Sequence, residues 1–374
     1  MFQASLIIFL ISLAISGLIL LLHQRLPHLV ARRDDLSAVQ KSHLNPTPRI
    51  GGLAILVGVL IIPFMQEHQS SGWFIALILS LIPVASAGLA EDLGLVISPR
   101  MRLFAAALSS VVAILLLDVW IPRLDVVGLD VLMHWNVLAF TFTIVATAGV
   151  SHAFNLIDGL NGLSGGVSVV SLLGLTAIAG HAPGLGVVEI GLLLTAAVLG
   201  FLVFNFPFGT IFLGDAGAYS LGHIIVWYSI YLVWTIDDLA TWAVALILFW
   251  PLADTLYSIY RRRYTGKKLD QPDRLHFHQV VMRTLQIKFL GRNKIALANP
   301  LATSVMIPLF IAPTLTGTLL WNQPLLAALA LLGFAAAFVL AYQFLIRIST
   351  IRVTPKHRSG YWILGSTRDL RAER

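Results

Sequence analysis

The residues most able to do chemistry are gathered in residues 155–163, Asn-Leu-Ile-Asp-Gly-Leu-Asn-Gly-Leu, which separate two strongly apolar stretches. Asn155, Asp158 and Asn161 follow one another at a spacing of three, and the glycines that follow Asp158 and Asn161 allow the backbone to come close to a ligand. Carboxylate and amide oxygens are hard ligands for Mg²⁺ or Mn²⁺, which use one or two protein carboxylates together with substrate phosphates. A polar connector between two helices is the ordinary alternative, but a connector does not need this spacing. We therefore interpret the segment as a binding site for a divalent metal ion and a diphosphate.

Further polar clusters lie far from this one in the sequence. Each has an ordinary explanation when taken alone, namely an extended linker, a solvated helix end, a turn, or surface histidines in a basic loop. Their basic side chains, among them Arg49 and Arg274, could bind phosphate oxygens. No phosphate-binding loop of the G-x-x-x-x-G-K-[ST] type is present, which leaves an ATP-driven pump of that kind without support. The clusters are residues 43–52, Glu91 with Asp92, Asn205 with residues 212–217 around Asp215, and residues 273–278 with Asp273, Arg274, His276 and His278.

The elements that must position these clusters are membrane helices. The chain is 57% hydrophobic and only 11% charged, and apolar runs long enough to span a bilayer, about 17–25 residues, recur along it. Backbone polar groups in lipid must be satisfied internally, so we expect an all-α polytopic membrane protein that forms a single domain over residues 1–374. The expected spans number about eleven: 2–22, 50–65, 73–90, 103–121, 135–152, 166–181, 187–205, 219–236, 239–257, 300–320 and 325–346.

The distribution of lysine and arginine predicts the orientation of these helices. If the first helix runs from outside to inside, only Arg123 of the 25 basic residues lies outside. The N-terminus is then periplasmic and the C-terminus cytoplasmic, and all five polar clusters lie on the cytoplasmic face, which indicates one active site built from cytoplasmic loops. The net charge of +7 needs no nucleic-acid partner, because a basic cytoplasmic face suits anionic lipid headgroups and substrates. The cytoplasmic segments include a long loop, 257–299, which carries the histidines, and a basic tail, 347–374.

Two other features limit the possible classes. Residues 2–22 lack a basic start and a small-residue cleavage site, so we expect a retained helix rather than a signal peptide. The chain has no cysteine, which excludes disulfides and any thiolate nucleophile or metal ligand.

The five clusters, in their order, spacing and sidedness from about residue 43 to residue 278, resemble those of the polyprenyl-phosphate N-acetylhexosamine-1-phosphate transferases, glycosyltransferase family 4. The resemblance implies a bacterial inner-membrane enzyme that transfers an N-acetylhexosamine 1-phosphate, most closely GlcNAc-1-phosphate, from a UDP-sugar to undecaprenyl phosphate. UMP would be released, and cell-surface glycan synthesis, such as that of O-antigen, would begin. It implies Mg²⁺, or Mn²⁺, as cofactor and membrane lipids as surroundings, and it leaves a homodimer open.

The resemblance also implies roles for individual residues. Asp92, Glu91 and Asp158 would be catalytic, with Asp92 orienting or deprotonating the lipid phosphate, and Asp215 and Asn155 would hold the metal. Phe212 would stack on uracil beside Asn205. The remaining expected substrate-binding residues are Lys41, His43, Arg49, Asn161, Asp273, Arg274, His276 and His278.

Some positions depart from the family pattern. Bacterial members usually have aspartate where this chain has Glu91, which makes Asp92 the better candidate for the close contact. Leu95 stands where many members carry a charge, and Asn161 replaces a common aspartate. The sequence His-Phe-His-Gln at 276–279 argues against the muramyl-pentapeptide branch. Two alternatives remain: another UDP-N-acetylhexosamine, or a secondary transporter, whose sites would lie at the bilayer midplane in repeated halves.

Overall fold

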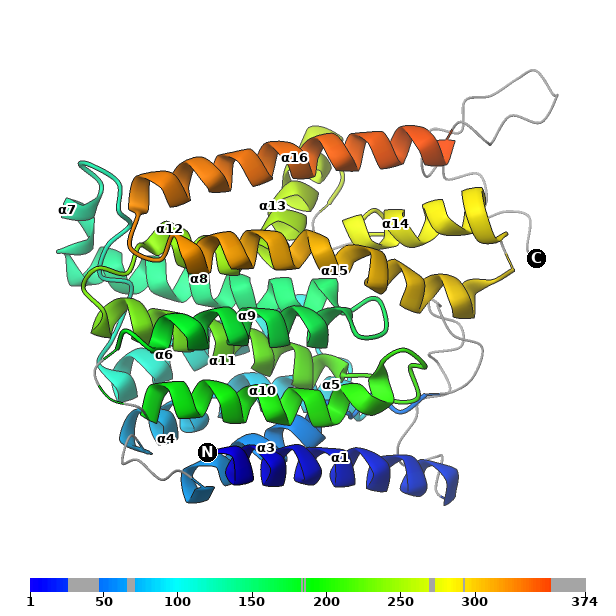
Figure 1. Cartoon of the computed structure of the whole chain (residues 1–374), viewed down its shortest axis with the longest axis horizontal. Helices are drawn as coiled ribbons and strands as arrows, with labels where there is room; N and C mark the ends of the chain where they lie inside the picture. The colour runs from blue at the N-terminus through cyan, green and yellow to red at the C-terminus, as the bar shows by residue number, and fades with distance from the viewer. Residues whose placement is uncertain are drawn as a thin grey trace.

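Helices make up all the regular secondary structure in the part of the chain that the computed structural model describes, which is residues 1–25, 47–65, 71–182, 184, 186–268, 273–291 and 293–350. The expected all-α class is therefore confirmed. The α-helices, labelled in Figure 1, are α1 (Phe2–Arg25), α3 (Gly52–Met65), α4 (Ser71–Ser80), α5 (Ile82–Asp92), α6 (Pro99–Leu117), α7 (Asp130–Met133), α8 (Asn136–Ile157), α9 (Leu163–Ala179), α10 (Gly186–Asn205), α11 (Gly214–Thr235), α12 (Thr241–Ile247), α13 (Phe249–Tyr264), α14 (Phe277–Leu285), α15 (Ile295–Leu319) and α16 (Pro324–Thr350).

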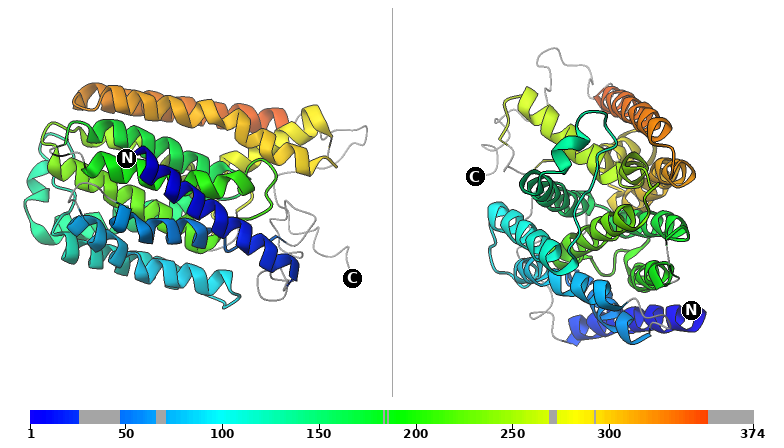
Figure 2. Two further views of the ribbon diagram at one scale, coloured as in Figure 1. Left: turned by 60° about the horizontal axis from the view of Figure 1, so that its bottom comes forward. Right: turned by 90° about the vertical axis from the view of Figure 1, so that its left-hand side faces the viewer.

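Every expected span corresponds to a helix or to a bent pair of helices. Seven of the described helices are long and apolar enough to cross a membrane, and the bent pairs α4–α5 and α12–α13 bring the number to nine. The shorter apolar helices α3 and α9 account for the other two expected spans. Figure 1 and Figure 2 show most of these helices packed side by side along a common direction, as in a polytopic membrane protein.

The expected span 239–257 is broken in the structure, where α12 and α13 meet at an angle of 82°. Pro251 gives the physical reason, because a proline ring inside a continuous helix would clash with the carbonyl of residue 247. The freed oxygen of Ile247 accepts hydrogen bonds from the hydroxyls of Ser171, at 3.2 Å, and Thr314, at 3.4 Å, so this carbonyl is satisfied in spite of the break. Beyond the break, α13 lies across the direction of the bundle (Figure 2).

The segment 257–299, expected as a long loop, is largely helical. It contains the end of α13, all of α14, a π-helical turn (Gln286–Leu290) and the start of α15. The histidines thus lie at the beginning of a helix that packs on α15 and α16, not on a free loop.

Glycines allow three helices to touch through their backbones. A Cβ on Gly52 of α3 would lie 2.3 Å from Cα of Gly217 in α11, and one on Gly88 of α5 would lie 2.5 Å from the backbone nitrogen of Ala216. Small residues permit this close approach between helices in a membrane. The contact fixes the first turn of α11 between α3 and α5.

The two ends of α11 mark the two ends of the bundle. The polar clusters meet at its N-terminus, whereas Arg123 hydrogen-bonds the carbonyls of Asp237 and Leu239, at 2.6 and 2.8 Å, just beyond its C-terminus. A helix of 22 residues is about 33 Å long, so the single basic residue expected outside lies a membrane thickness away from the clusters.

Candidate active site

Asp215 lies at the centre of the polar end, in the first turn of α11. Its Oδ1 accepts a hydrogen bond from the amide of Asn155 at 3.1 Å, and its Oδ2 pairs with Nη1 of Arg102 at 2.5 Å. Arg49 lies 4.0 Å from Oδ1. The side chain of Asp215 is 9% exposed, so three segments far apart in the sequence surround one nearly buried negative charge.

Asp92 holds the backbone of this turn. Its two carboxylate oxygens accept the N–H groups of Asp215 and Ala216, at 2.8 and 2.9 Å. The first N–H groups of a helix have no partner within it, so the last residue of α5 caps α11. Gly214 has φ +76° and a Cβ there would lie 1.8 Å from the carbonyl oxygen of Arg49, so only glycine fits this approach.

Glu91 has a different partner from its neighbour. Its Oε2 accepts the N–H of Ile97 at 2.7 Å and so fixes the turn between α5 and α6. Because Arg102 lies in the first turns of α6, Glu91 contributes to placing the guanidinium that pairs with Asp215. The structure therefore separates the two acids: Asp92 orders α11, and Glu91 orders the entry to α6.

Asp158 follows α8 and faces the same group of charges. Burial of its carboxyl raises the pKa to about 7; the negative charges of Asp215 and Asp92 act in the same direction, and Arg49 opposes them. Three carboxylates thus interact within one site. A bound cation would relieve their repulsion.

The donor set fits a magnesium-type ion held partly by substrate. No group of three or more histidine or acidic side chains in the described ranges could enclose a metal by itself. Mg²⁺ typically takes one or two carboxylates and completes its shell with phosphate oxygens and water. Asp215 supplies such a carboxylate, and Asn155 lies within hydrogen-bond distance of it.

Asn161 and Asn205, expected to bind substrate, use their side chains to join two loops. The Oδ1 of Asn205 accepts the N–H of Gly162 at 2.7 Å, and its amide donates to the carbonyl of Ile211 at 2.7 Å. The amide of Asn161 donates to the carbonyl of Pro207 at 3.0 Å. Both side chains brace the loops that lead into α9 and α11, and their contact with substrate stays a prediction.

Two residues of α15 complete this brace. The side-chain oxygen of Asn299 accepts a hydrogen bond from the backbone N–H of Asn161 at 2.8 Å. The hydroxyl of Thr303 donates to the backbone carbonyl of Asn161, also at 2.8 Å. Phe212 is half-buried, and its backbone pairs with Pro48 and Gly51, which brings the segment before α3 into the site. Lys41 and His43, from that same segment, lie outside the described residues.

The histidine segment joins the site through residues 155–163. His276 and His278 are buried, and their rings stack with centroids 5.7 Å apart. A Cβ on Gly159 would lie 2.4 Å from Nε2 of His278, so this ring rests directly on the loop that carries Asp158. Arg274 is exposed beside them.

Four polar residues of the site were not expected from the sequence. Arg102 pairs with Asp215, and the hydroxyl of Tyr219 lies 3.2 Å from Nδ1 of His152. Asp254 lies 2.9 Å from His276. A signal existed for Asp254, because an ionisable residue inside an apolar span is a functional candidate by default.

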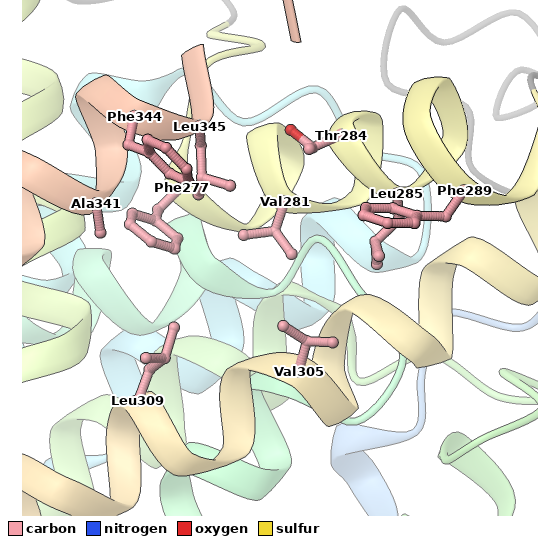
Figure 3. A pocket seen from close by; sticks show the side chains of 10 residues that line it. All are labelled: Phe277, Val281, Thr284, Leu285, Phe289, Val305, Leu309, Ala341, Phe344 and Leu345. Atoms are coloured by element: carbon pink, nitrogen blue, oxygen red, sulfur yellow. The ribbon is translucent and has the colours of Figure 1, made fainter. Parts of the chain in front are cut away.

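A groove of about 300 Å³ lies between α14, α15 and α16, and Phe277 forms part of its lining (Figure 3). Thr284 is its one polar lining residue, and the hydroxyl of that side chain is bonded to the carbonyl of Val280. The groove therefore offers no group for phosphate chemistry. That chemistry belongs to the polar cluster around Asp215.

Comparison with known proteins gives a consistent result. Residues 74–233 match the family model described as glycosyl transferase family 4. A Bacillus subtilis protein named as a probable undecaprenyl-phosphate N-acetylglucosaminyl 1-phosphate transferase is 27% identical over 249 residues, which are 66% of this chain and 69% of the relative. A Thermotoga maritima undecaprenyl-phosphate alpha-N-acetylglucosaminyl 1-phosphate transferase is 28% identical over 66% of this chain and 72% of its own. A Mycobacterium leprae decaprenyl-phosphate N-acetylglucosaminephosphotransferase is 26% identical over 80% and 81%.

Proposed function

We propose, from the match of residues 74–233 to the model of glycosyl transferase family 4, that this chain transfers N-acetylglucosamine 1-phosphate from UDP-N-acetylglucosamine to a polyprenyl phosphate such as undecaprenyl phosphate, with release of UMP. The observation that carries the proposal is the meeting of Asp92, Asp158 and Asp215 with Arg49 and Arg102 at one end of a membrane bundle. Such a cluster suits a reaction between two phosphate-bearing substrates, one of which cannot leave the membrane.

In the proposed reaction, an oxygen of the lipid phosphate attacks the β-phosphorus of the donor, and the bond from that phosphorus to UMP breaks. Catalysis of phosphoryl transfer rests on alignment and charge neutralisation. Arg49 and Arg102 supply positive charge beside Asp215. A phosphate with a second pKa near 6 is largely dianionic at pH 7, so no strong base is required. This agrees with the structure, in which both carboxylate oxygens of Asp92 accept hydrogen bonds from the backbone of α11.

We propose Mg²⁺, or Mn²⁺, as the cofactor, held by Asp215 and Asn155. When bound, the ion would neutralise charge on the diphosphate and on the leaving UMP. Arg102 now pairs with the same carboxylate, and the phosphate groups of the donor would give its guanidinium a second anionic partner.

The decisive experiment is UMP release by purified protein supplied with undecaprenyl phosphate. UDP-N-acetylglucosamine is expected to support turnover best. UDP-N-acetylgalactosamine and UDP-N-acetylfucosamine test the alternative donors. If no donor releases UMP while vesicles containing the protein accumulate a solute, the transporter would replace this proposal.

The orientation of the bundle gives a separate prediction. We propose a bacterial inner-membrane location with the site facing the cytoplasm, supported by the position of Arg123 beyond one end of α11 and of Arg49 and Arg102 beside the other end. Because the chain lacks cysteine, Val127→Cys and Lys267→Cys, both at exposed positions near opposite ends, can be labelled selectively. In intact cells an impermeant maleimide is expected to label Val127→Cys and to reach Lys267→Cys only after permeabilisation. The reverse pattern would invert the topology.

A further inference from the structure

One face of α13 binds the histidine segment over its length. Asp254, Ser258 and Arg261 recur at spacings of four and three, which places them on one side of the helix. The hydroxyl of Ser258 donates to Asp273 at 2.6 Å, and Arg261 pairs with the same carboxylate. The segment after residue 272 is thereby tied to a helix that the break at Leu248 has turned out of the bundle direction.

The carboxylate of Asp254 makes the central contacts of this face. Its Oδ1 accepts the N–H of Phe277 at 2.8 Å, and its Oδ2 lies 2.9 Å from Nδ1 of His276 and 3.7 Å from Nδ1 of His278. Asp254 is 2% exposed. One buried carboxylate thus faces both imidazoles and the first turn of α14.

The ring of His278 connects this network to the metal-binding end. It is 1% exposed, and neither its Nδ1, which lies 3.7 Å from Asp254, nor its Nε2 has a hydrogen-bond partner among the described residues. The Nε2 atom points to Gly159, where a Cβ would lie 2.4 Å away, whereas Gly159 itself is partly exposed. A buried nitrogen left unpaired is costly, so a substrate group that reaches over Gly159 would satisfy it.

We propose that Asp254 is a positioning residue, whose carboxylate fixes His276 and sets His278 over Gly159 so that the pair meets the donor's sugar phosphate. This rests on the proposed function for the identity of the donor. Asp254 itself touches neither substrate nor metal and acts through the two rings.

The charge state of the pair follows from the same geometry. The pKa of His276 is raised. Burial and the positive charge of Arg261 disfavour the charged ring, but the hydrogen bond to Asp254 and the negative charges of Asp254 and Asp273 outweigh both effects. The pKa of His278 is lowered, chiefly by burial. His276 therefore remains protonated to higher pH than a free histidine, while His278 stays neutral. The charged groups facing His276 are Asp254 and Arg261 from α13, Asp273 from its own segment, and His278 from α14.

The test is Asp254→Asn, which keeps the size of the side chain and removes its charge. We expect the pH at which His276 titrates to fall by about one unit or more, since a neighbouring opposite charge shifts a pKa by that amount. KM for the UDP-sugar is expected to rise about tenfold or more. The further rise of KM with pH, as His276 loses its proton, is expected to begin at a lower pH in the variant than in the wild type. Asp238→Asn, an exposed change at the opposite end, is the matched control and should leave both unchanged.

A purely structural carboxylate would behave differently. It would lower the thermal unfolding temperature in Asp254→Asn but leave the pH dependence of KM unchanged, and this result would overturn the proposal. Adding Asp254→Asn to a variant that already carries His276→Gln and His278→Gln should cost little more, because Asp254 acts through those two rings; an additive loss would also overturn the proposal. If Asp254→Asn does not fold, Asp254→Glu serves instead. It retains the charge, so the pKa of His276 should stay raised while KM for the UDP-sugar increases.

The titration of His276, followed by NMR of histidine-labelled protein, needs no substrate. It therefore separates the two proposals. If the titration of His276 shifts as expected in Asp254→Asn but no donor supports UMP release, only the proposed function is overturned. If UMP is released but the titration does not shift, only the role of Asp254 is overturned.

Discussion

Asp215→Asn is expected to lower the rate of UMP release by about a thousandfold or more. The change removes a formal charge from the proposed metal ligand, and several kcal/mol of transition-state stabilisation correspond to a loss of that size. Asparagine keeps the shape of the side chain and a single oxygen, so the contact with Asn155 or with Arg102 can persist but not the ion pair. The measurement is single-turnover and steady-state UMP release with varied Mg²⁺.

Two controls accompany this variant. The protein should still fold with a cooperative thermal transition, because Asp92 continues to hold the backbone of residue 215 after the ion pair with Arg102 is lost. Wild-type protein should lose activity in excess EDTA and regain it with Mg²⁺ or Mn²⁺. Full turnover by Asp215→Asn, or by wild type in EDTA, would contradict the metal role.

Asp92→Asn is expected nearly to abolish UMP release while UDP-sugar binding is retained. An asparagine can accept only one of the two N–H groups from Asp215 and Ala216, and its amide would face the other. A buried donor left unpaired costs about 1–3 kcal/mol, and a displacement of about 1 Å at a reacting group can cost about a hundredfold in rate. The unfolding temperature should fall together with the activity.

Glu91 provides the comparison. Glu91→Gln retains an oxygen that can accept the N–H of Ile97, so its loss should be milder, and Glu91→Asp should be close to neutral because the turn can adjust. Turnover, UDP-sugar affinity and thermal unfolding are measured together on membrane-inserted protein. An inactive Glu91→Gln beside an active Asp92→Asn would reverse the roles within the pair.

The sequence was sufficient for the helices and for the clusters, because both depend on local composition. Apolar length identifies a span, and a run such as 155–163 is conspicuous between two of them. The described parts of all five clusters do meet, through contacts such as those of Asp92 with Asp215 and of Gly159 with His278.

The partners of individual side chains could not be predicted in the same way. Asn161 and Asn205 have the residue type of a ligand, yet their hydrogen bonds go to backbone groups of neighbouring loops, which only the packed bundle brings within reach. Arg102 lies at the start of a helix, where a basic side chain commonly faces solvent, and its pairing with Asp215 joins residues 113 apart. The break at Leu248, which turns Asp254 toward the histidines, depends on one proline.

The backbone contact of Gly52, Gly88 and Gly217 has a consequence for the thermodynamics of binding. Helices that touch without side chains between them have few conformations to lose, and Asp92 immobilises the same turn from α5. A ligand arriving at α11 therefore meets preorganised groups and incurs little entropic cost there. Any closure over the donor must instead come from segments attached by side chains, of which residues 273–278 on α13 are the clearest example.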